Sequence, residues 1–227
     1  MHRKKTIEHV AIIMDGNRRW ALKRNLKRTI GHKAGINNCI RILKNLDKLD
    51  FRINNISLYV FSTENWKRSI SEVNLLFNLI ENYYSDLKET AKDENLKIKH
   101  LGSTKNLSPK LRNIIKNVVK TTENNNGTCI NLGFNYGGRM EIIDAIKKNK
   151  LSTINNNILS KNLYIPDLPD PNLIIRTGGE MRLSNFLLWQ SAYSELFFTR
   201  VLWPNFKINL FNRILCNYSN RNRKYGE

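Results

Sequence analysis

Long apolar runs, paired cysteines and acidic residues are all scarce in this chain of 227 residues. No run approaches the roughly 18 apolar residues that a membrane-spanning helix needs. The run Val10–Met14 is too short for a secretory signal and is followed by Asp15. The three cysteines, Cys39, Cys129 and Cys216, are too far apart to suggest a zinc motif or a disulfide framework. We therefore expect a protein of the reducing cytoplasm.

The shortage of acids leaves the chain strongly basic, with 38 Lys and Arg against 19 Asp and Glu and a formal net charge of +19. Three explanations stay open: a composition rich in Lys, Asn and Ile, peripheral contact with the anionic inner face of a membrane, or nucleic acid. We do not expect nucleic acid as a partner. Seven of the cations are close together between positions 18 and 33: Arg18, Arg19, Lys23, Arg24, Lys27, Arg28 and Lys33.

Six apolar runs of strand length alternate with stretches of helical periodicity, which predicts an α/β fold. We expect a single domain over residues 1–227, with a central, mostly parallel six-stranded sheet flanked by helices. The stretch Lys150–Pro171 is the least structured and is expected to be a surface excursion. The strand-like runs are Val10–Met14, Ile56–Phe61, Leu96–Leu101, Cys129–Phe134, Leu173–Ile175 and Leu196–Val201.

Polar or glycine-bearing segments directly follow five of these runs. Because ligands of open parallel sheets bind at the carboxyl ends of the strands, these segments predict one composite site. After the first run, Asp15 and Gly16 suit a metal or a diphosphate, although Asp15 could equally be a helix cap. Arg28, Gly31 and His32 form a second basic group, which could instead be a solvated helix face.

The segment after the fifth run has two arginines, Arg176 and Arg182, on either side of a glycine pair. Guanidinium groups bind diphosphate oxygens in pairs, but surface salt bridges are the alternative. Ser184 could add a donor, and Glu195 lies in an apolar context where a carboxylate needs a metal or an arginine as its partner. The loop from Ser62 to Arg68 either closes over the site or is a packed turn.

The predicted helix Val73–Leu87 has one wide apolar stripe. Packing against the sheet explains such a stripe. The alternative is that part of it lines an apolar tunnel for a hydrocarbon ligand.

Six segments together are similar to the ordered motifs of the cis-prenyltransferase family, typified by undecaprenyl diphosphate synthase. The resemblance covers nearly the whole chain, and the Asp-rich motif of the trans-type synthases is absent. The segments are HVAIIMDGNRRWA at His9–Ala21, GHKAG at Gly31–Gly35, YVFSTENWKR at Tyr59–Arg68, NYGGR at Asn135–Arg139, IRTGGEMRLSNFLLWQ at Ile175–Gln190 and SELFFTRVLWP at Ser194–Pro204.

The resemblance implies a Mg²⁺-dependent homodimer that adds isopentenyl diphosphate repeatedly to an allylic diphosphate such as farnesyl diphosphate. The product would be a long polyprenyl diphosphate, undecaprenyl diphosphate above all, the precursor of the lipid carrier for cell-wall glycans. By the same resemblance, Asp15 and Asn65 are catalytic, and Asp15 and Glu195 bind the metal. The implied substrate-binding residues are Gly16, Asn17, Arg18, Arg19, Trp20, Arg28, His32, Ser62, Thr63, Glu64, Trp66, Arg68, Arg176, Arg182, Leu183 and Ser184.

Three positions depart from the family pattern. Arg18 stands where some members have glycine, and Met181 stands where a histidine is common. The C-terminal Arg-x-Gly pattern is replaced by Lys224-Tyr225-Gly226, which puts its reach to a partner subunit's site in doubt. None of the three touches Asp15 or the paired arginines, so we expect an active enzyme.

Overall fold

The computed structural model describes residues 4–148 and 153–221. A six-stranded sheet forms its centre, with strand order β3-β4-β2-β1-β5-β6. Every neighbouring pair in it is parallel, so the expected α/β fold is confirmed and the sheet is wholly parallel. The strands are β1 (Lys5–Ile13), β2 (Phe51–Ser62), β3 (Lys97–Leu101), β4 (Cys129–Tyr136), β5 (Leu173–Arg176) and β6 (Glu195–Phe198).

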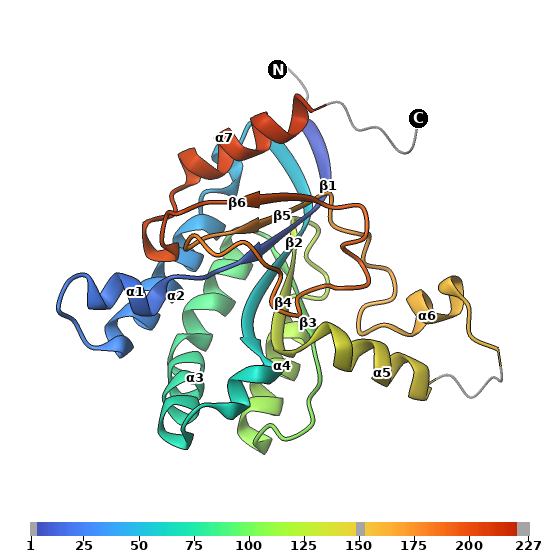
Figure 1. Ribbon diagram of the computed structural model, residues 1–227, viewed down its shortest axis with the longest axis horizontal. Helices are drawn as coiled ribbons and strands as arrows, with labels where there is room; N and C mark the ends of the chain where they lie inside the picture. Colours follow the sequence, from blue (N-terminus) through green and yellow to red (C-terminus); the bar gives the residue numbers. More distant parts are fainter. Residues whose placement is uncertain (1–3, 149–152, 222–227) are drawn as a thin grey trace.

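Helices connect the strands and cover the sheet. Figure 1 shows α3 and α4 together at the bottom of the view and α5 and α6 apart from them at the right. Ser108 caps α4, as its sequence predicts, by accepting a hydrogen bond from the Leu111 N–H. The helices are α1 (Asn17–Leu22), α2 (Arg28–Leu43), α3 (Ile70–Asp93), α4 (Pro109–Thr121), α5 (Gly138–Lys148), α6 (Asn156–Asn162) and α7 (Ile208–Ser219).

Both faces of the sheet are buried, as is usual for parallel sheets. Along β1 the side chains alternate between two apolar clusters. Val10 and Ile12 join the larger cluster, which includes residues of α2, α4 and α7. Ala11 and Ile13 join a smaller one with Phe186 of the segment after β5. The core therefore holds β1 rigidly from both sides and fixes the place where the strand ends.

The topology brings three strand ends together. β1 lies between β2 and β5, and Ile13 is in register with both Tyr59 and Arg176. From β1 the chain runs outward on one side through β2, and from β5 it runs outward on the other side through β6. The strand order therefore reverses between β1 and β5, which is where open α/β sheets bind their ligands.

The structure differs from the sequence-based expectation at several boundaries. β1 begins at Lys5 and β2 at Phe51, each five residues before the predicted start. The described part of the predicted surface excursion, residues 153–171, is more ordered than expected, because residues 156–162 form α6. Leu159 of α6 and Leu163 after it are buried against Ala145 of α5. Within the described residues, no helix is long and apolar enough to cross a membrane.

Candidate active site

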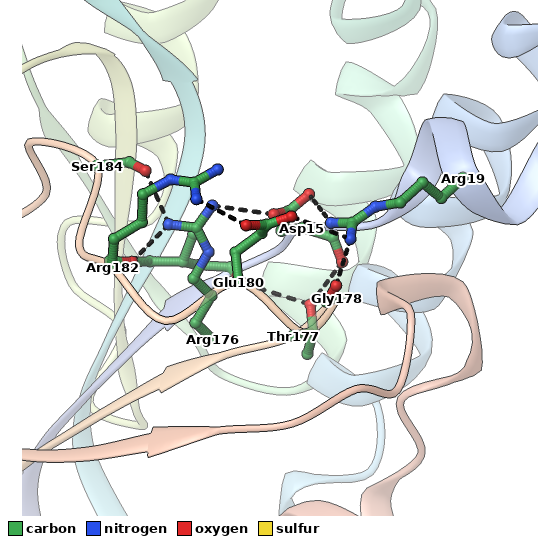
Figure 2. A network of polar contacts seen from close by, with 9 residues as sticks. Asp15, Arg19, Arg176, Thr177, Gly178, Glu180, Arg182 and Ser184 are labelled. Atoms are coloured by element: carbon green, nitrogen blue, oxygen red, sulfur yellow. Dashed lines mark hydrogen bonds and ion pairs between the residues drawn. The ribbon is translucent and has the colours of Figure 1, made fainter.

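Asp15 lies just beyond the end of β1 and contacts two arginines from opposite sides (Figure 2). Its Oδ2 is 2.9 Å from Nη2 of Arg176, the last residue of β5. Its Oδ1 is 3.0 Å from Nη2 of Arg19, one turn along in α1. The Arg176 side chain is 6% exposed and that of Asp15 is 28% exposed. The carboxylate therefore joins the segment after β1 to the segment after β5.

Arg176 is fixed by further contacts within its own segment. Its Nη1 donates to the Ser184 Oγ at 2.7 Å and to the Arg182 carbonyl. Arg182 itself is more exposed and pairs with Glu180 at 2.6 Å. Within residues 4–148 and 153–221, the buried Nε–H of Arg176 has no acceptor. A charged guanidinium with a buried, unsatisfied N–H is suited to an anionic oxygen.

Two glycines allow these segments to approach each other. Gly16 has φ +113° and Gly178 has φ +88°, in the region that side chains disfavour. A Cβ on Gly178 would lie 3.0 Å from the Asp15 carbonyl oxygen and 2.8 Å from Arg19 Nη2. Any larger residue at Gly178 would therefore push apart the two segments that Asp15 connects.

Gly31 and Gly35 allow α2 to approach α1 closely. A Cβ on Gly31 would lie 2.2 Å from the Asn17 carbonyl oxygen, and one on Gly35 would lie 2.4 Å from the Asn17 Oδ1. The spacing of four residues places both glycines on one face of α2, against α1. The Asn17 Oδ1 is buried, and no described residue donates a hydrogen bond to it. Asn17 is therefore packed against α2 at the cleft, and its Oδ1 can accept a hydrogen bond from a ligand.

The loop after β2 is a short 3-10 helix, residues 63–67, preceded by register shifts between β2 and β4. Ser62 and Asn65 cap it reciprocally: the Asn65 Oδ1 accepts from the Ser62 N–H at 3.0 Å, and the Ser62 side chain accepts from the Asn65 N–H. Arg68 pairs with Glu72 at the start of α3 at 2.9 Å. The loop is therefore closed by its own hydrogen bonds and joined to α3 through Arg68.

Asn185 is the contact that sequence reasoning missed. Its Nδ2 donates to the Glu64 Oε1 at 2.6 Å, and its Oδ1 accepts from the Arg139 N–H at 2.9 Å. It therefore links the loop after β2, the start of α5 and the segment after β5. Asn185 lies within the segment Ile175–Gln190, but no pattern in the sequence distinguishes it from other asparagines.

The polar cleft between these segments has a volume of about 870 Å³. Five arginines and three carboxylates line it, so it favours anions. Of the predicted site residues, its lining includes Asp15, Gly16, Asn17, Arg18, Arg19, His32, Ser62, Glu64, Asn65, Arg68, Arg176, Arg182 and Ser184.

The structure does not place the other predicted site residues in the lining of the cleft. Trp20 donates to the Asn205 Oδ1 at 2.9 Å, and Trp66 donates to the Asn135 Oδ1 at 2.7 Å. Thr63 lies against Gly137, where a Cβ would come within 2.3 Å of its Oγ1. Arg28 begins α2, and Leu183 packs beside Phe186.

Glu195 is far from Asp15 within one chain. It is the first residue of β6 and is in register with Leu173 at the start of β5, so it lies at the amino end of its strand. Its carboxylate pairs with Arg221 rather than with Arg182, the arginine considered from sequence. A metal shared by Asp15 and Glu195 of the same chain does not agree with this placement. Lys224-Tyr225-Gly226 lies outside the described residues.

His32 lies at the boundary between the cleft and a second, apolar cavity. Burial lowers the pKa of His32 below its usual 6.5, and the nearby Arg68 lowers it further, while Glu72 opposes both. The imidazole is therefore neutral at pH 7. In that form it has one ring nitrogen as a donor and the other as an acceptor.

The apolar cavity has a volume of about 200 Å³ and continues from the cleft, with which it shares Met14, His32 and Leu76. Part of the stripe on α3 faces it, and α2, α4 and the strands β2, β3 and β4 supply the other walls. Hydrocarbon side chains make up most of its lining, among them Ile36, Ile40, Leu79, Ile80, Ile115 and Val119.

The carboxylates of the cleft fit one common mode of Mg²⁺ binding. The described residues hold no group of three or more His, Cys, Asp and Glu side chains that could bind a metal by themselves. Mg²⁺ is commonly bound by one or two carboxylates together with waters and substrate phosphates. Asp15, partly exposed in an anion-binding cleft, fits that mode.

The chain is similar to known proteins over nearly its whole length. Residues 13–226 match the prenyltransferase family described as undecaprenyl diphosphate synthase. An isoprenyl transferase of Treponema denticola is 45% identical, with 97% of each chain covered. A ditrans,polycis-undecaprenyl-diphosphate synthase, (2E,6E)-farnesyl-diphosphate specific, of Wigglesworthia glossinidia brevipalpis is 41% identical, with 96% of this chain and 87% of that protein covered.

A solved structure has the same fold. It is lavandulyl diphosphate synthase from Lavandula x intermedia, in complex with dimethylallyl diphosphate. Its TM-score is 0.90 and its sequence identity is 32%, with 97% of this chain and 98% of that chain covered.

Proposed function

Because the chain belongs to the undecaprenyl diphosphate synthase family of prenyltransferases, and so is a transferase of isoprenyl groups, we propose that it extends an allylic diphosphate with isopentenyl diphosphate. Farnesyl diphosphate is the proposed primer, as in the name of the Wigglesworthia relative. The proposed product is undecaprenyl diphosphate, the carrier precursor for cell-wall glycans. The observation that carries the proposal is a cleft rich in arginine that opens into an apolar cavity.

The cleft offers two groups of anion-binding residues. Arg176, Arg182 and Ser184 would bind isopentenyl diphosphate, with the free Nε–H of Arg176 as an added donor. On the other side, Arg18, Arg19 and the neutral His32 would bind the allylic diphosphate. Aligning two substrates in one cleft turns a bimolecular attack into an effectively intramolecular one.

The proton released on condensation needs an acceptor. Asn65 lines the cleft, but its Oδ1 already accepts from the Ser62 N–H, and an amide is a poor base. Asn65 would therefore orient the isopentenyl group. The departing diphosphate is the alternative acceptor of the proton.

The proposed cofactor is Mg²⁺, held by Asp15 and by substrate oxygens. When bound, it would neutralise the charge that develops on the leaving diphosphate. Arg19 and Arg176, each about 3 Å from the Asp15 carboxylate, keep that carboxylate oriented between the two anion sites.

The apolar cavity is the proposed entrance to a tunnel for the growing chain. Each buried CH₂ contributes about 0.8 kcal/mol, so intermediates stay bound until they are long. Side chains at the closed end would then limit the product length.

The test is to incubate the protein with radiolabelled isopentenyl diphosphate, farnesyl diphosphate and Mg²⁺, and to read product lengths by mass spectrometry. A series ending near eleven isoprene units, a length set by the named product, is expected. The absence of any condensation product, with the protein folded by circular dichroism, would refute the proposal.

A homodimer in the cytoplasm is the proposed assembly. Met140, Ile143 and Ile146 recur every three residues along α5 and are exposed. Leu196 is exposed on β6, an edge strand of the sheet, and edges of this kind need covering. We expect Ile143→Asp to give monomers in light scattering, whereas Ile154→Asp, also at an exposed isoleucine, should leave the dimer intact.

The proposed dimer gives Glu195 a route to a metal in the neighbouring subunit's cleft. The ion pair with Arg221 provides a matched control, because Arg221→Gln breaks the same pair without removing a carboxylate. Glu195→Gln, but not Arg221→Gln, should raise the Mg²⁺ concentration needed for half-maximal activity. Equal Mg²⁺ titrations for both variants would remove Glu195 from the proposed metal ligands.

Mixed dimers test whether Glu195 acts across the interface. One protomer carries Asp15→Ala and the other Glu195→Gln. Action in trans leaves one complete site, made of Asp15 from one protomer and Glu195 from the other. At the Mg²⁺ concentration that half-saturates the unmodified protein, the mixture should be more active than either parent. No gain over the parents would show that Glu195 does not act across the interface.

A further inference from the structure

The connection between α1 and α2 is unusually exposed and contains apolar residues. All residues from Leu22 to Arg28 are exposed. Three large hydrophobic side chains recur at a spacing of four: Leu22 is 53% exposed, Leu26 39% and Ile30 43%. Figure 1 shows this connection, drawn in blue, projecting from the left side of the molecule. We call residues 22–30 the α1–α2 corner.

The corner is also strongly cationic. It contains Lys23, Arg24, Lys27 and Arg28, and no Asp or Glu occurs between Asp15 and Asp47. Arg24 lies over the Trp20 ring at 4.2 Å. Among the described residues, no carboxylate is within ion-pair distance of the other three cations of the corner. Their charge is therefore available to an outside partner.

A projecting corner that carries both apolar side chains and cations fits the interfacial region of a membrane. The apolar side chains enter the boundary of the acyl chains, and the cations meet anionic headgroups. A nucleic acid would use the cations but would gain little from exposed leucine and isoleucine. We propose that the α1–α2 corner docks the protein on an anionic phospholipid surface.

The corner is joined to both parts of the proposed active site. α1 brings Asn17 and Arg19 to the cleft, and α2 continues into the wall of the apolar cavity at Ile36 and Ile40. Docking at the corner would place these helices next to the bilayer that must receive a long hydrocarbon product. This use of the surface rests on the proposed function, whereas the docking itself does not.

The test is sedimentation of the full chain with phosphatidylcholine vesicles, with and without phosphatidylglycerol. We expect binding only to the anionic vesicles, weakened by salt. Lys23→Gln/Lys27→Gln should weaken it by about fivefold for each cation removed, as expected for basic residues at an anionic surface. Leu22→Ser/Leu26→Ser should weaken it without changing its dependence on salt.

Matched controls lie elsewhere on the surface. Lys116→Gln/Lys120→Gln makes the same charge change on α4, and Ile154→Ser removes another exposed isoleucine. Both should bind like the unmodified protein. Equal losses in corner and control variants would overturn the proposal, as would tighter binding to an RNA oligonucleotide than to anionic vesicles.

Catalysis in detergent separates this proposal from the proposed function. The corner variants should turn over normally in detergent and lose only the stimulation that anionic vesicles give. Failure of the proposed function would abolish turnover in detergent without affecting sedimentation. Failure of the docking proposal would abolish sedimentation and leave turnover in detergent intact.

Discussion

The two walls of the cleft are built differently. In the wall after β5, Arg176 is buried and bound by Asp15, Ser184 and a backbone carbonyl. In the wall formed by α1, α2 and the loop after β2, Arg18 is exposed and Arg68 is paired only with Glu72, four residues on. The first wall is fixed before a ligand arrives, whereas the second can rearrange around one.

The fixed wall holds its shape at a cost. Ser184, Asn185 and Leu187 have φ of +50°, +67° and +47°, a conformation that costs non-glycine residues about 1–3 kcal/mol each. Asn185 offsets part of this cost through its bonds to Glu64 and the Arg139 N–H. Strain retained beside an arginine cluster is typical of preorganised sites.

Asp15 contacts both walls, so its removal should have the largest effect. Asp15→Ala should lower kcat by about a hundredfold or more, because the proposed metal ligand and the link between Arg19 and Arg176 are lost together. Steady-state kinetics and circular dichroism measure activity and fold. Asp47→Ala, at an exposed acid away from the cleft, should remain fully active. Retention of more than about a tenth of kcat would contradict the assignment.

Arginine substitutions should separate the walls by substrate. Arg176→Ala and Arg182→Ala should raise KM for isopentenyl diphosphate far more than KM for the allylic primer. Arg18→Ala, in the other wall, should do the reverse. Losing a charged hydrogen bond costs about 1.5–3 kcal/mol. Equal increases in both KM values for every variant would show that the two diphosphates are not divided between the walls as proposed.

Asn185 should govern how well the mobile wall closes on the fixed one. Asn185→Gly removes both side-chain bonds while tolerating the positive φ, so strain does not confuse the result. We expect kcat to fall about thirtyfold, with smaller changes in KM, because two hydrogen bonds of about 1 kcal/mol each are lost. Asn113→Gly, at an exposed position of α4, is a control for fold. A change confined to KM would show that Asn185 affects binding rather than closure.

The sequence predicted the strand runs and the meeting of polar segments at one edge, because apolar runs followed by polar turns are local patterns. The five added residues at the start of β1 could not be predicted, because Lys5 and Thr6 are polar and pair with β2 only in the folded sheet. The burial of Leu159 and Leu163 could not be predicted either, because they stand in a polar stretch and are buried only by packing against α5 in the folded chain.

Long-range partners were the other part that the sequence could not supply. Glu195 pairs with Arg221, which is 26 residues away in the sequence. Asn185 donates a hydrogen bond to Glu64, which is 121 residues away. Such pairs depend on which strand ends lie side by side. Only the strand order, with β1 between β2 and β5, determines that.

The smallest expected effect is a pH dependence confined to the mobile wall. The folded-state pKa of His32 is lowered by burial and by Arg68, so the ring gains its proton only as the pH falls below 6.5 toward that lowered value. The new cation should lower KM for the allylic diphosphate by no more than about fivefold, the range of partly exposed ion pairs. KM for isopentenyl diphosphate should not follow, because the fixed wall relies on arginines, which stay charged.

The control is His32→Gln, which keeps a polar side chain but cannot gain the charge. Substrate ionisation affects both proteins alike, so the difference between their profiles reports the histidine. Acid should therefore strengthen binding of the allylic diphosphate but lower the thermal stability of the fold. Because the folded pKa is depressed, neutral His32 favours the fold above pH 6.5, and that contribution is lost as the pH falls. The unmodified protein should therefore lose more thermal stability in acid than His32→Gln. If both substrates' KM values changed together, or if the two proteins had identical profiles, His32 would not belong to the allylic side of the cleft.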